Sequence, residues 1–231
     1  MSSGKVSAVL VHGAWADGSS WSKVIERLKE QGINAVAAPL PLTSLSDDVA
    51  ALDRVLERID GPVVLAGHAY AGAVIGATRS DKVEALVYVA ALAPDEGETV
   101  GDVFHRGESH PQAPQLAPNR HGLIWLPDEA FPQAFAQDAT RGELAVLAAV
   151  QRPISVACIG EVVGRPLWKD RPSWFLVAGR DRMINPDTQR FMAGRMNAQV
   201  RAYQVDHTPS VTAPDAVTDV IVEALQSVSA R

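Results

Sequence analysis

Apolar positions along the first 93 residues follow two alternating patterns. Short continuous apolar runs are typical of strands that are buried on both faces of a parallel sheet. Between them lie longer segments in which apolar residues recur every three or four positions, as on one face of a helix. The predicted strands are residues 6–13, 33–41, 62–67 and 83–92, and the predicted helices are residues 19–32, 44–61 and 70–79. This alternation predicts a parallel sheet with helices on both faces.

The ends of two of these helices carry capping residues. Gly32 ends the segment 19–32, at the position where a left-handed C-terminal residue is favoured. Ser46 or Asp47 is placed to accept a hydrogen bond from the first turn of the next helix. We therefore predict that the second helix begins next to one of these two residues.

The regular alternation stops at Pro94. From there to Arg171 the chain is rich in proline, and residues 142–151 are the clearest helix. So long an interruption indicates an inserted lid rather than a loop. The alternation then resumes with a strand over 172–181, a helix over 187–196, a strand over 199–205 and a helix over 214–228. The predicted organisation is a core formed by residues 1–93 and 172–231, with a lid formed by residues 94–171.

Composition restricts the class of protein. The 231 residues carry a formal net charge of −6 and contain no run of Lys and Arg that would follow a phosphate backbone, so nucleic acid is not an expected partner. The apolar run before His12 is too short for a signal peptide, and none approaches the roughly 18 apolar residues of a membrane span. A single cysteine, Cys158, suits a reducing compartment. We expect a cytoplasmic protein without membrane contact.

Polar and small residues gather where the predicted parallel strands end, which is where α/β sheets bind ligands. The first strand runs into the sequence HGAW (residues 12–15), and the third runs into a small-residue turn centred on Ala69. The fifth strand ends in Asp181, and His207 follows the sixth. An acid and a base on neighbouring strands allow the carboxylate to hold the imidazole in one tautomer. The order of nucleophile position, acid and base is that of a hydrolase triad.

Other titratable residues have alternative interpretations. Asp95 also follows a strand and is a rival for the acid. Asp187 and Asp206 are predicted to cap helices and face solvent. We expect His12 to shape its loop and His68 to be a packing residue. The histidines of the lid are predicted to be solvated: His105, His110 and His121. Their scatter argues against a metal site.

Taken together, these segments resemble the α/β-hydrolase superfamily, and within it the small esterase-like proteins that include bacterial esterases, plant methyl-ester hydrolases and hydroxynitrile lyases. The resemblance covers nearly the whole chain, through VLVHGAWADGSSW, VVLAGHAYAGAV, ALVYVAALAPDEGE, VAGRDRMINPDTQRFM and, more loosely, DHTPSVTAPDAV. It implies an α/β-hydrolase fold with a mostly parallel sheet of about six strands and a helical lid insertion.

The resemblance also assigns site residues. Family members usually carry Gly-His-Ser-x-Gly at the elbow, so the nucleophile position is Ala69, which lacks a hydroxyl. Asp181 would be the acid and His207 the base. The backbone N–H groups of Ala14 and Tyr70 would form the oxyanion hole. The walls of the substrate pocket are assigned to Trp15 and Trp125, each with core packing as the alternative.

Two functional interpretations follow. The first is a serine-type carboxylic-ester hydrolase whose nucleophile has been replaced by Ala69, as an engineered change that leaves acid, base and oxyanion loop intact. The second is a naturally nucleophile-free binder, lyase or cyclase that uses His207. A hydroxynitrile lyase is disfavoured because no Lys follows His207. The expected ligand is a small ester or lactone, with no cofactor or metal, and the lid leaves open both closure over substrate and a homodimer surface.

Overall fold

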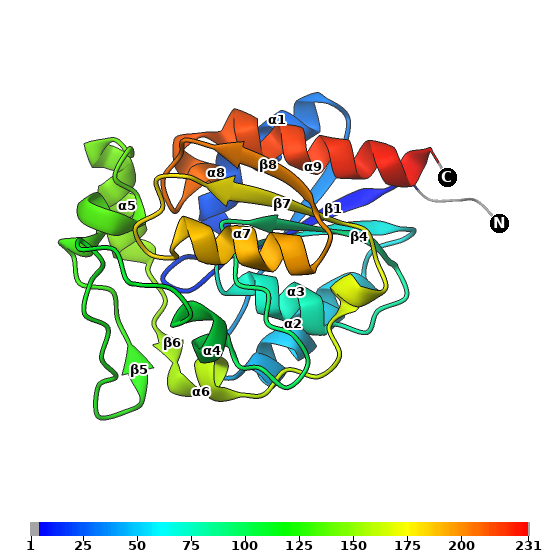
Figure 1. Ribbon diagram of the computed structural model, residues 1–231. Coiled ribbons are helices and arrows are strands. Elements are labelled where there is room, and N and C mark those ends of the chain that lie inside the picture. Colours follow the sequence, from blue (N-terminus) through cyan, green and yellow to red (C-terminus); the bar gives the residue numbers. More distant parts are fainter. Residues whose placement is uncertain (1–4, 231) are drawn as a thin grey trace.

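The computed structural model describes residues 5–230, and its central sheet has six parallel strands (Figure 1). Their order is β2-β1-β3-β4-β7-β8. The strands are β1 (Ser7–Val11), β2 (Asn34–Ala38), β3 (Val63–His68), β4 (Val83–Val89), β7 (Ser173–Ala178) and β8 (Gln199–Tyr203). Every pairing between them is parallel. The predicted α/β-hydrolase fold with its parallel six-stranded sheet is confirmed.

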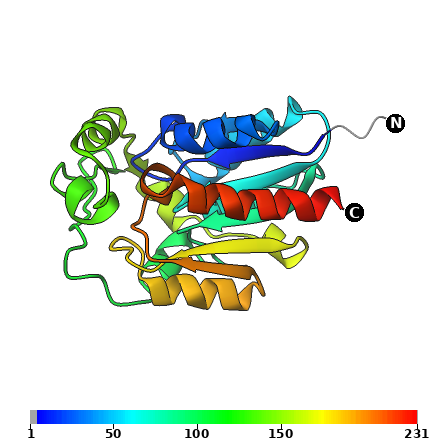
Figure 2. The ribbon, with the colours of Figure 1, turned by 90° about the horizontal axis from the view of Figure 1, so that it is seen from above.

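Helices cover both faces of this sheet, as Figures 1 and 2 show from two directions. The helix α1 (Ser22–Glu30), preceded by the short 3-10 helix η1 (Gly18–Trp21), packs with α9 (Pro214–Ser229) on one face, next to the short α8 (Pro209–Thr212). The other face is covered by α2 (Leu45–Glu57), α3 (Ala71–Ala77) and α7 (Pro186–Arg195). Alternate residues of each strand therefore enter two separate cores, so Val64 packs toward α1 and α9 whereas Leu65 packs on the opposite face.

The helix caps differ in one place from the prediction. Ser44, rather than Ser46 or Asp47, is the N-cap of α2: its backbone is extended and its side chain accepts a hydrogen bond from the Asp47 N–H. Asp47 lies inside the first turn, where a negative charge is favoured by the helix dipole. Gly32 follows α1 with a φ of +72°, as expected for a glycine beyond a helix C-terminus.

Between β4 and β7 the chain leaves the sheet and packs over the carboxyl ends of the strands (Figures 1 and 2). We call residues 94–171 the insertion. It contains α4 (Val100–Phe104), β5 (Leu123–Ile124), the π-helix η2 (Phe131–Phe135), α5 (Arg141–Val150), β6 (Ile154–Ser155), α6 (Val156–Gly160) and the 3-10 helix η3 (Leu167–Lys169). Only α5 was predicted as a helix. Residues 1 and 231, the outer boundaries of the predicted core, lie outside the described residues. The first four residues of the N-terminal segment that was weighed as a signal peptide also lie outside them.

The insertion is attached to the loops that follow the core strands. The Trp15 backbone N–H donates to the Arg152 carbonyl at 3.0 Å, and the Trp15 indole N–H donates to the Ile124 carbonyl at 3.0 Å. The Ser155 N–H donates to the Leu42 carbonyl at 3.0 Å. These bonds fix the insertion above the carboxyl ends of β1 and β2, the region in which the sequence places the candidate site.

Candidate active site

The turn between β3 and α3 holds Ala69 in a left-handed conformation, with a φ of +50°. Such a backbone is strained for a residue with a side chain. Small neighbours make the turn feasible. A Cβ on Gly67 would lie 2.8 Å from the Ala71 carbonyl oxygen, and a Cβ on Gly72 would lie 2.3 Å from that of Leu92. This strand–turn–helix geometry is the one in which a nucleophile elbow presents its side chain.

Asp181 and His207 come together as predicted from their positions after two strands. Asp181 lies in the loop after β7, and His207 lies in the loop after β8, the neighbouring parallel strand. The His207 Nδ1 lies 2.8 Å from the Asp181 Oδ2. Both residues are almost fully buried. Because an ionised carboxylate only accepts hydrogen bonds, this contact puts the imidazole proton on Nδ1 and leaves Nε2 as an acceptor.

The Asp181 carboxylate is held by three further donors. Its Oδ1 accepts the backbone N–H groups of Met183 and Ile184, at 2.7 and 2.9 Å. Its Oδ2 accepts the Gln189 side-chain N–H at 2.8 Å. Gln189 lies on α7 and is fully buried. The carboxylate is therefore fixed in orientation by two elements, which fixes the plane of the His207 ring. Sequence reasoning did not identify Gln189, since an amide on a helix carries no distinctive pattern.

His68, the last residue of β3, contacts His207 directly. Its Nε2–H donates to the His207 carbonyl oxygen at 2.7 Å, and the centroids of the two rings are 4.9 Å apart. Complete burial, with a smaller contribution from the neighbouring His207 imidazole, lowers the pKa of the His68 imidazole to about 3. His68 is therefore neutral near pH 7. It packs in the interior, and its hydrogen bond joins the loop that carries His207 to the elbow.

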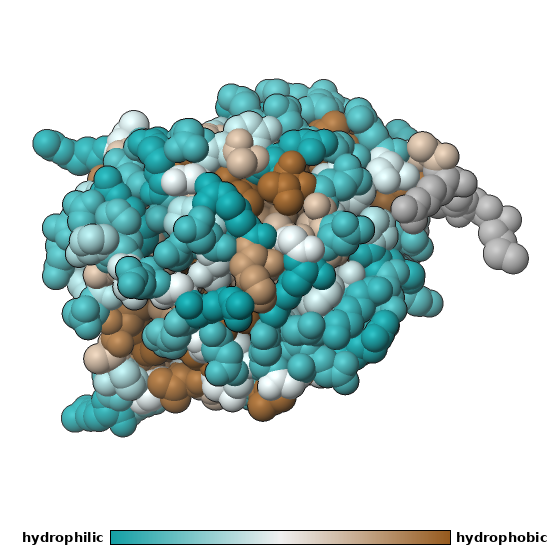
Figure 3. Space-filling model, in the orientation of Figure 1, coloured by the Kyte–Doolittle hydropathy of each residue, from teal (hydrophilic) through white to brown (hydrophobic). Residues whose placement is uncertain are grey.

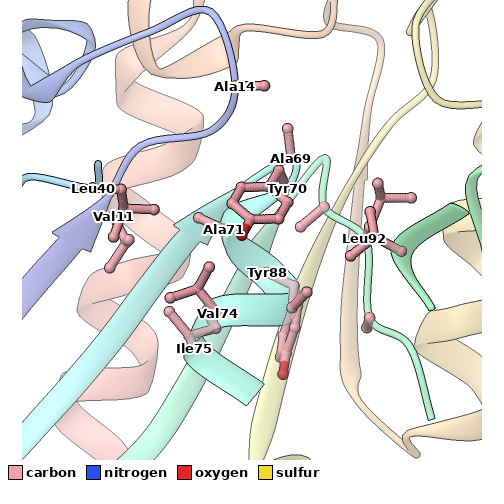
Figure 4. Close-up of a cluster of buried hydrophobic side chains, with 14 of the residues drawn as sticks. Val11, Ala14, Leu40, Ala69, Tyr70, Ala71, Val74, Ile75, Tyr88 and Leu92 are labelled. Atoms are coloured by element: carbon pink, nitrogen blue, oxygen red, sulfur yellow. The ribbon is translucent and has the colours of Figure 1, made fainter. Parts of the chain in front are cut away.

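Two backbone N–H groups predicted to form an oxyanion hole border the same cavity. Ala14 and Tyr70 both line the same cavity as Ala69 and His207. Neither backbone N–H has a hydrogen-bond acceptor within residues 5–230. Figure 4 shows Ala14 on the loop after β1 and Tyr70 next to Ala69 on the elbow, at the same end of the sheet. Buried amides are rarely left unpaired, so their partner is expected to be a bound ligand or water.

His12 fixes the shape of the Ala14 loop. Its Nδ1–H donates to the Gly13 carbonyl at 2.9 Å, and its Nε2 accepts the Leu40 N–H at 3.0 Å. Burial lowers the pKa of this imidazole. Gly13 then packs so closely on the elbow that a Cβ would lie 2.9 Å from the His68 carbonyl oxygen. The loop and the elbow are thus held together by contact of their backbones.

The cavity above the elbow has a volume of about 300 Å³ and is lined mainly by apolar residues. Trp15 is one of the lining residues. Trp125 is not, and its side chain is 49% exposed. His105, at the end of α4, was predicted to be solvated, and it is exposed. It also lines the cavity. The apolar lining contributed by the insertion is Val100, Phe104, Leu116, Ile124, Ile154, Val156 and Ile159.

The surface over β5, β6 and α6 carries a group of apolar side chains (Figure 3). Among the exposed large apolar residues are Trp125, Val156 and Val162, all of the insertion. Val156 also lines the cavity. The apolar lining thus continues onto the outer face of the insertion.

Asp95, the rival for the acid, and the two aspartates predicted to cap helices have other partners. Asp95 pairs with the Lys169 ammonium at 2.5 Å. Asp187 contacts Arg190, and Asn185 rather than Asp187 caps α7. Asp206 was predicted to face solvent, which is wrong: it is fully buried, and its carboxylate accepts hydrogen bonds from the Asp138 N–H at 3.0 Å and from a threonine hydroxyl.

No cluster of three or more His, Cys, Asp or Glu side chains suited to a metal ion occurs among residues 5–230. Over the same range, no helix combines the length and apolar character that a membrane span requires.

Comparisons with known proteins agree with this fold. A model of the alpha/beta hydrolase family matches residues 8–220. Among curated proteins, lipase LipV from Mycobacterium tuberculosis is 31% identical over 115 residues, which cover 44% of this chain and 43% of the lipase. The alignment thus spans less than half the length of that relative.

Solved structures match over nearly the full length. A pyrethroid hydrolase from Sphingobium faniae JZ-2 superposes with a TM-score of 0.82 at 20% identity, over 98% of this chain and 100% of that one. A serine-to-alanine variant of pyrethroid hydrolase PytH gives 0.84 at 19% identity, over 99% and 100%. Polyneuridine aldehyde esterase gives 0.78 at 17% identity, over 95% and 99%. The fold and the family model together show that the chain belongs to the alpha/beta hydrolase family.

Proposed function

We propose that this chain is a serine-type carboxylic-ester hydrolase in which Ala69 occupies the position of the nucleophile. One observation carries the proposal. One cavity is bordered by the strained elbow residue, by His207, which is paired with Asp181, and by Ala14 and Tyr70, whose backbone N–H groups have no acceptor among residues 5–230. A binding site alone would not need a base whose tautomer is fixed by a buried carboxylate.

In the form with serine at position 69, the serine hydroxyl would attack the ester carbonyl while His207 Nε2 accepts its proton. Asp181 would orient the imidazole and stabilise the imidazolium. The N–H groups of Ala14 and Tyr70 would hold the developing oxyanion, and such donors are worth about 3 kcal/mol each. Water activated by His207 would then release the acid. Apart from the serine hydroxyl at position 69, the chain's own residues supply every step, so we propose no cofactor.

The substrate we propose is a small ester or lactone that carries no charge. The insertion lines the cavity with aliphatic and aromatic side chains, and the polar side chains in the lining are those of His105, His207 and Tyr70. We propose that the insertion acts as the lid that selects this substrate. The relatives named as esterases, lipases or pyrethroid hydrolases support an ester, and a homodimer and a cytoplasmic location remain predictions.

We infer that Ala69 replaces a serine by design. A methyl group keeps the small volume that the elbow demands and removes only the attacking oxygen. The serine-to-alanine variant of a structural neighbour is an example of such a change. The natural alternative, a protein that lost its nucleophile and kept the pocket, predicts a different outcome in the following test.

The test compares the unmodified chain with Ala69→Ser and Ala69→Gly on short-chain p-nitrophenyl esters. Ala69→Ser should raise turnover at least about 10³-fold, in line with the losses seen when triad members are removed. Ala69→Gly is the matched control, because glycine suits the positive φ of position 69 and has no hydroxyl. Adding His207→Gln should abolish the gain. A folded Ala69→Ser variant that is inert on esters and lactones would overturn the proposal and favour the binder, lyase or cyclase.

A further inference from the structure

We propose that the chain as it stands, with a methyl group at position 69, abstracts a proton from a carbon atom adjacent to a carbonyl group. His207 is the base, and the backbone N–H groups of Ala14 and Tyr70 hold the enolate oxygen. The substrate class is an apolar ketone or a similar carbonyl compound. This activity needs no nucleophile, so it does not rest on the hydrolase proposed above.

The first support is the state of His207. Its Nδ1 proton is committed to Asp181 at 2.8 Å, so Nε2 carries a lone pair. No side chain or backbone group within residues 5–230 donates to Nε2, and His207 lines the cavity. In a serine hydrolase the nucleophile's hydroxyl occupies that lone pair. Here Ala69 leaves it open to a bound molecule.

The second support is the pair of free donors. The Ala14 and Tyr70 N–H groups border the same cavity and have no acceptor in the described part of the chain. Preorganised donors lower the energy of any intermediate that gathers negative charge on a carbonyl oxygen. An enolate gathers that charge as a tetrahedral intermediate does. A base and an oxyanion site without a nucleophile are therefore sufficient for proton abstraction, whereas acyl transfer also needs a hydroxyl at position 69.

The third support is the cavity lining. Apolar side chains such as Phe104, Leu116 and Ile159 surround the site, and the volume is about 300 Å³. Apolar surroundings strengthen a hydrogen bond to a developing oxyanion because few competing water dipoles are present. They also select a substrate without charge.

The step is balanced with the chain's own groups. The C–H bond breaks, its electron pair forms the C=C bond, and the carbonyl π pair moves to the oxygen. The proton goes to His207 Nε2, and Asp181 stabilises the resulting imidazolium. Return of a proton from His207, after exchange with solvent, regenerates the ketone. No oxidant, reductant or co-reactant other than water takes part.

The test is deuterium exchange of 2-tetralone in D₂O, followed by proton NMR, with the unmodified chain and His207→Gln. General-base catalysis predicts exchange about 10²-fold faster than with His207→Gln, which lacks the base but retains much of the volume. Asp181→Asn should lose most of this rate, because the imidazole tautomer is no longer fixed. His110→Ala, at an exposed position of the insertion, is the matched control and should exchange as the unmodified chain does. Thermal melts of all four proteins establish that they are folded.

Equal exchange with folded His207→Gln, at ketone concentrations up to the solubility limit, would overturn the proposal. The same ketone with Ala69→Ser separates it from the hydrolase. A hydroxyl at position 69 should take up the Nε2 lone pair and slow exchange several-fold, whereas ester turnover by that variant reports on the hydrolase alone. Suppose that Ala69→Ser gains esterase activity and still exchanges the ketone as fast as the unmodified chain. That result would contradict the proposal that the free lone pair of His207 Nε2 accepts the proton.

Discussion

At the scale of single residues, the elbow depends on glycines whose missing Cβ lets the backbone pack closely. Ala69 tolerates a φ of +50° because Gly67 and Gly72 let two backbone segments pass close to the turn. The nearest approach is at Gly72, where a Cβ would lie 2.3 Å from the Leu92 carbonyl oxygen. The Leu92 N–H in turn donates to the Ala69 carbonyl at 2.9 Å. The strain at position 69 is thus held by contacts with the segment after β4.

We predict that Gly72→Ala destabilises the fold by about 1–3 kcal/mol, since overpacking against backbone cannot be relieved by a side-chain rotation. Gly142→Ala, on α5, is the matched control: nothing lies within 4 Å of its added Cβ. That variant should gain up to about 1 kcal/mol, because alanine favours a helix more than glycine does. Urea unfolding of both variants checks the pair. Equal effects of the two substitutions would contradict the close approach.

At the scale of elements, a buried carboxylate joins α2, the elbow and α6. The Asp48 Oδ2 accepts the Tyr70 hydroxyl at 2.7 Å, and its Oδ1 accepts the Leu42 N–H at 2.7 Å. The Cys158 thiol of α6 lies 3.7 Å from the same carboxylate. Burial raises the pKa of the Asp48 carboxyl, and burial together with Asp48 raises that of the thiol to about 12. Asp48 thus connects Tyr70 of the elbow to the insertion.

Tyr70→Phe should therefore cost about 1–3 kcal/mol, because it removes a donor from a buried carboxylate. Tyr88→Phe is the matched control. The Tyr88 hydroxyl is fully buried and, among the described residues, has no hydrogen-bond partner. Its removal should be neutral or stabilising, since an unsatisfied polar atom leaves the core. Chemical denaturation of the two variants distinguishes them, and a stabilising Tyr70→Phe would contradict the role of the Asp48 contact.

The core elements and the strand-end residues could be predicted from sequence, but most of the structure within the insertion could not. Apolar runs located the strands, and the order of Ala69, Asp181 and His207 followed from the strand ends they occupy. Short elements such as α4 and α6, of five residues each, are too brief to show a helical period. Asp48 and Gln189 were missed because only tertiary contact gives them a partner. The placing of Trp125 outside the cavity depends on how the insertion folds back.

At the scale of the whole molecule, burial of two neutral imidazoles links stability to pH. Burial lowers the pKa of both His12 and His68, the latter to about 3. In the unfolded chain these groups titrate near 6.5. As pH falls below that value, the imidazoles bind protons in the unfolded chain but not in the folded protein, so the free energy of unfolding decreases. Burial raises the pKa of the Asp48 and Asp206 carboxyls, which acts in the opposite direction as acid protonates them.

The variant His68→Gln isolates one of these contributions, since both carboxyls and His12 remain. Glutamine is expected to keep a donor toward the His207 carbonyl and cannot gain a proton. Below pH 6.5 the free energy of unfolding of the unmodified protein should fall relative to the variant by up to about 1.4 kcal/mol per pH unit, the value for one proton. Urea unfolding between pH 7.5 and pH 4.5 measures the difference. His110→Gln, at an exposed position, should run parallel to the unmodified protein. If His68→Gln also runs parallel, the buried neutral imidazole does not set the acid sensitivity of the fold.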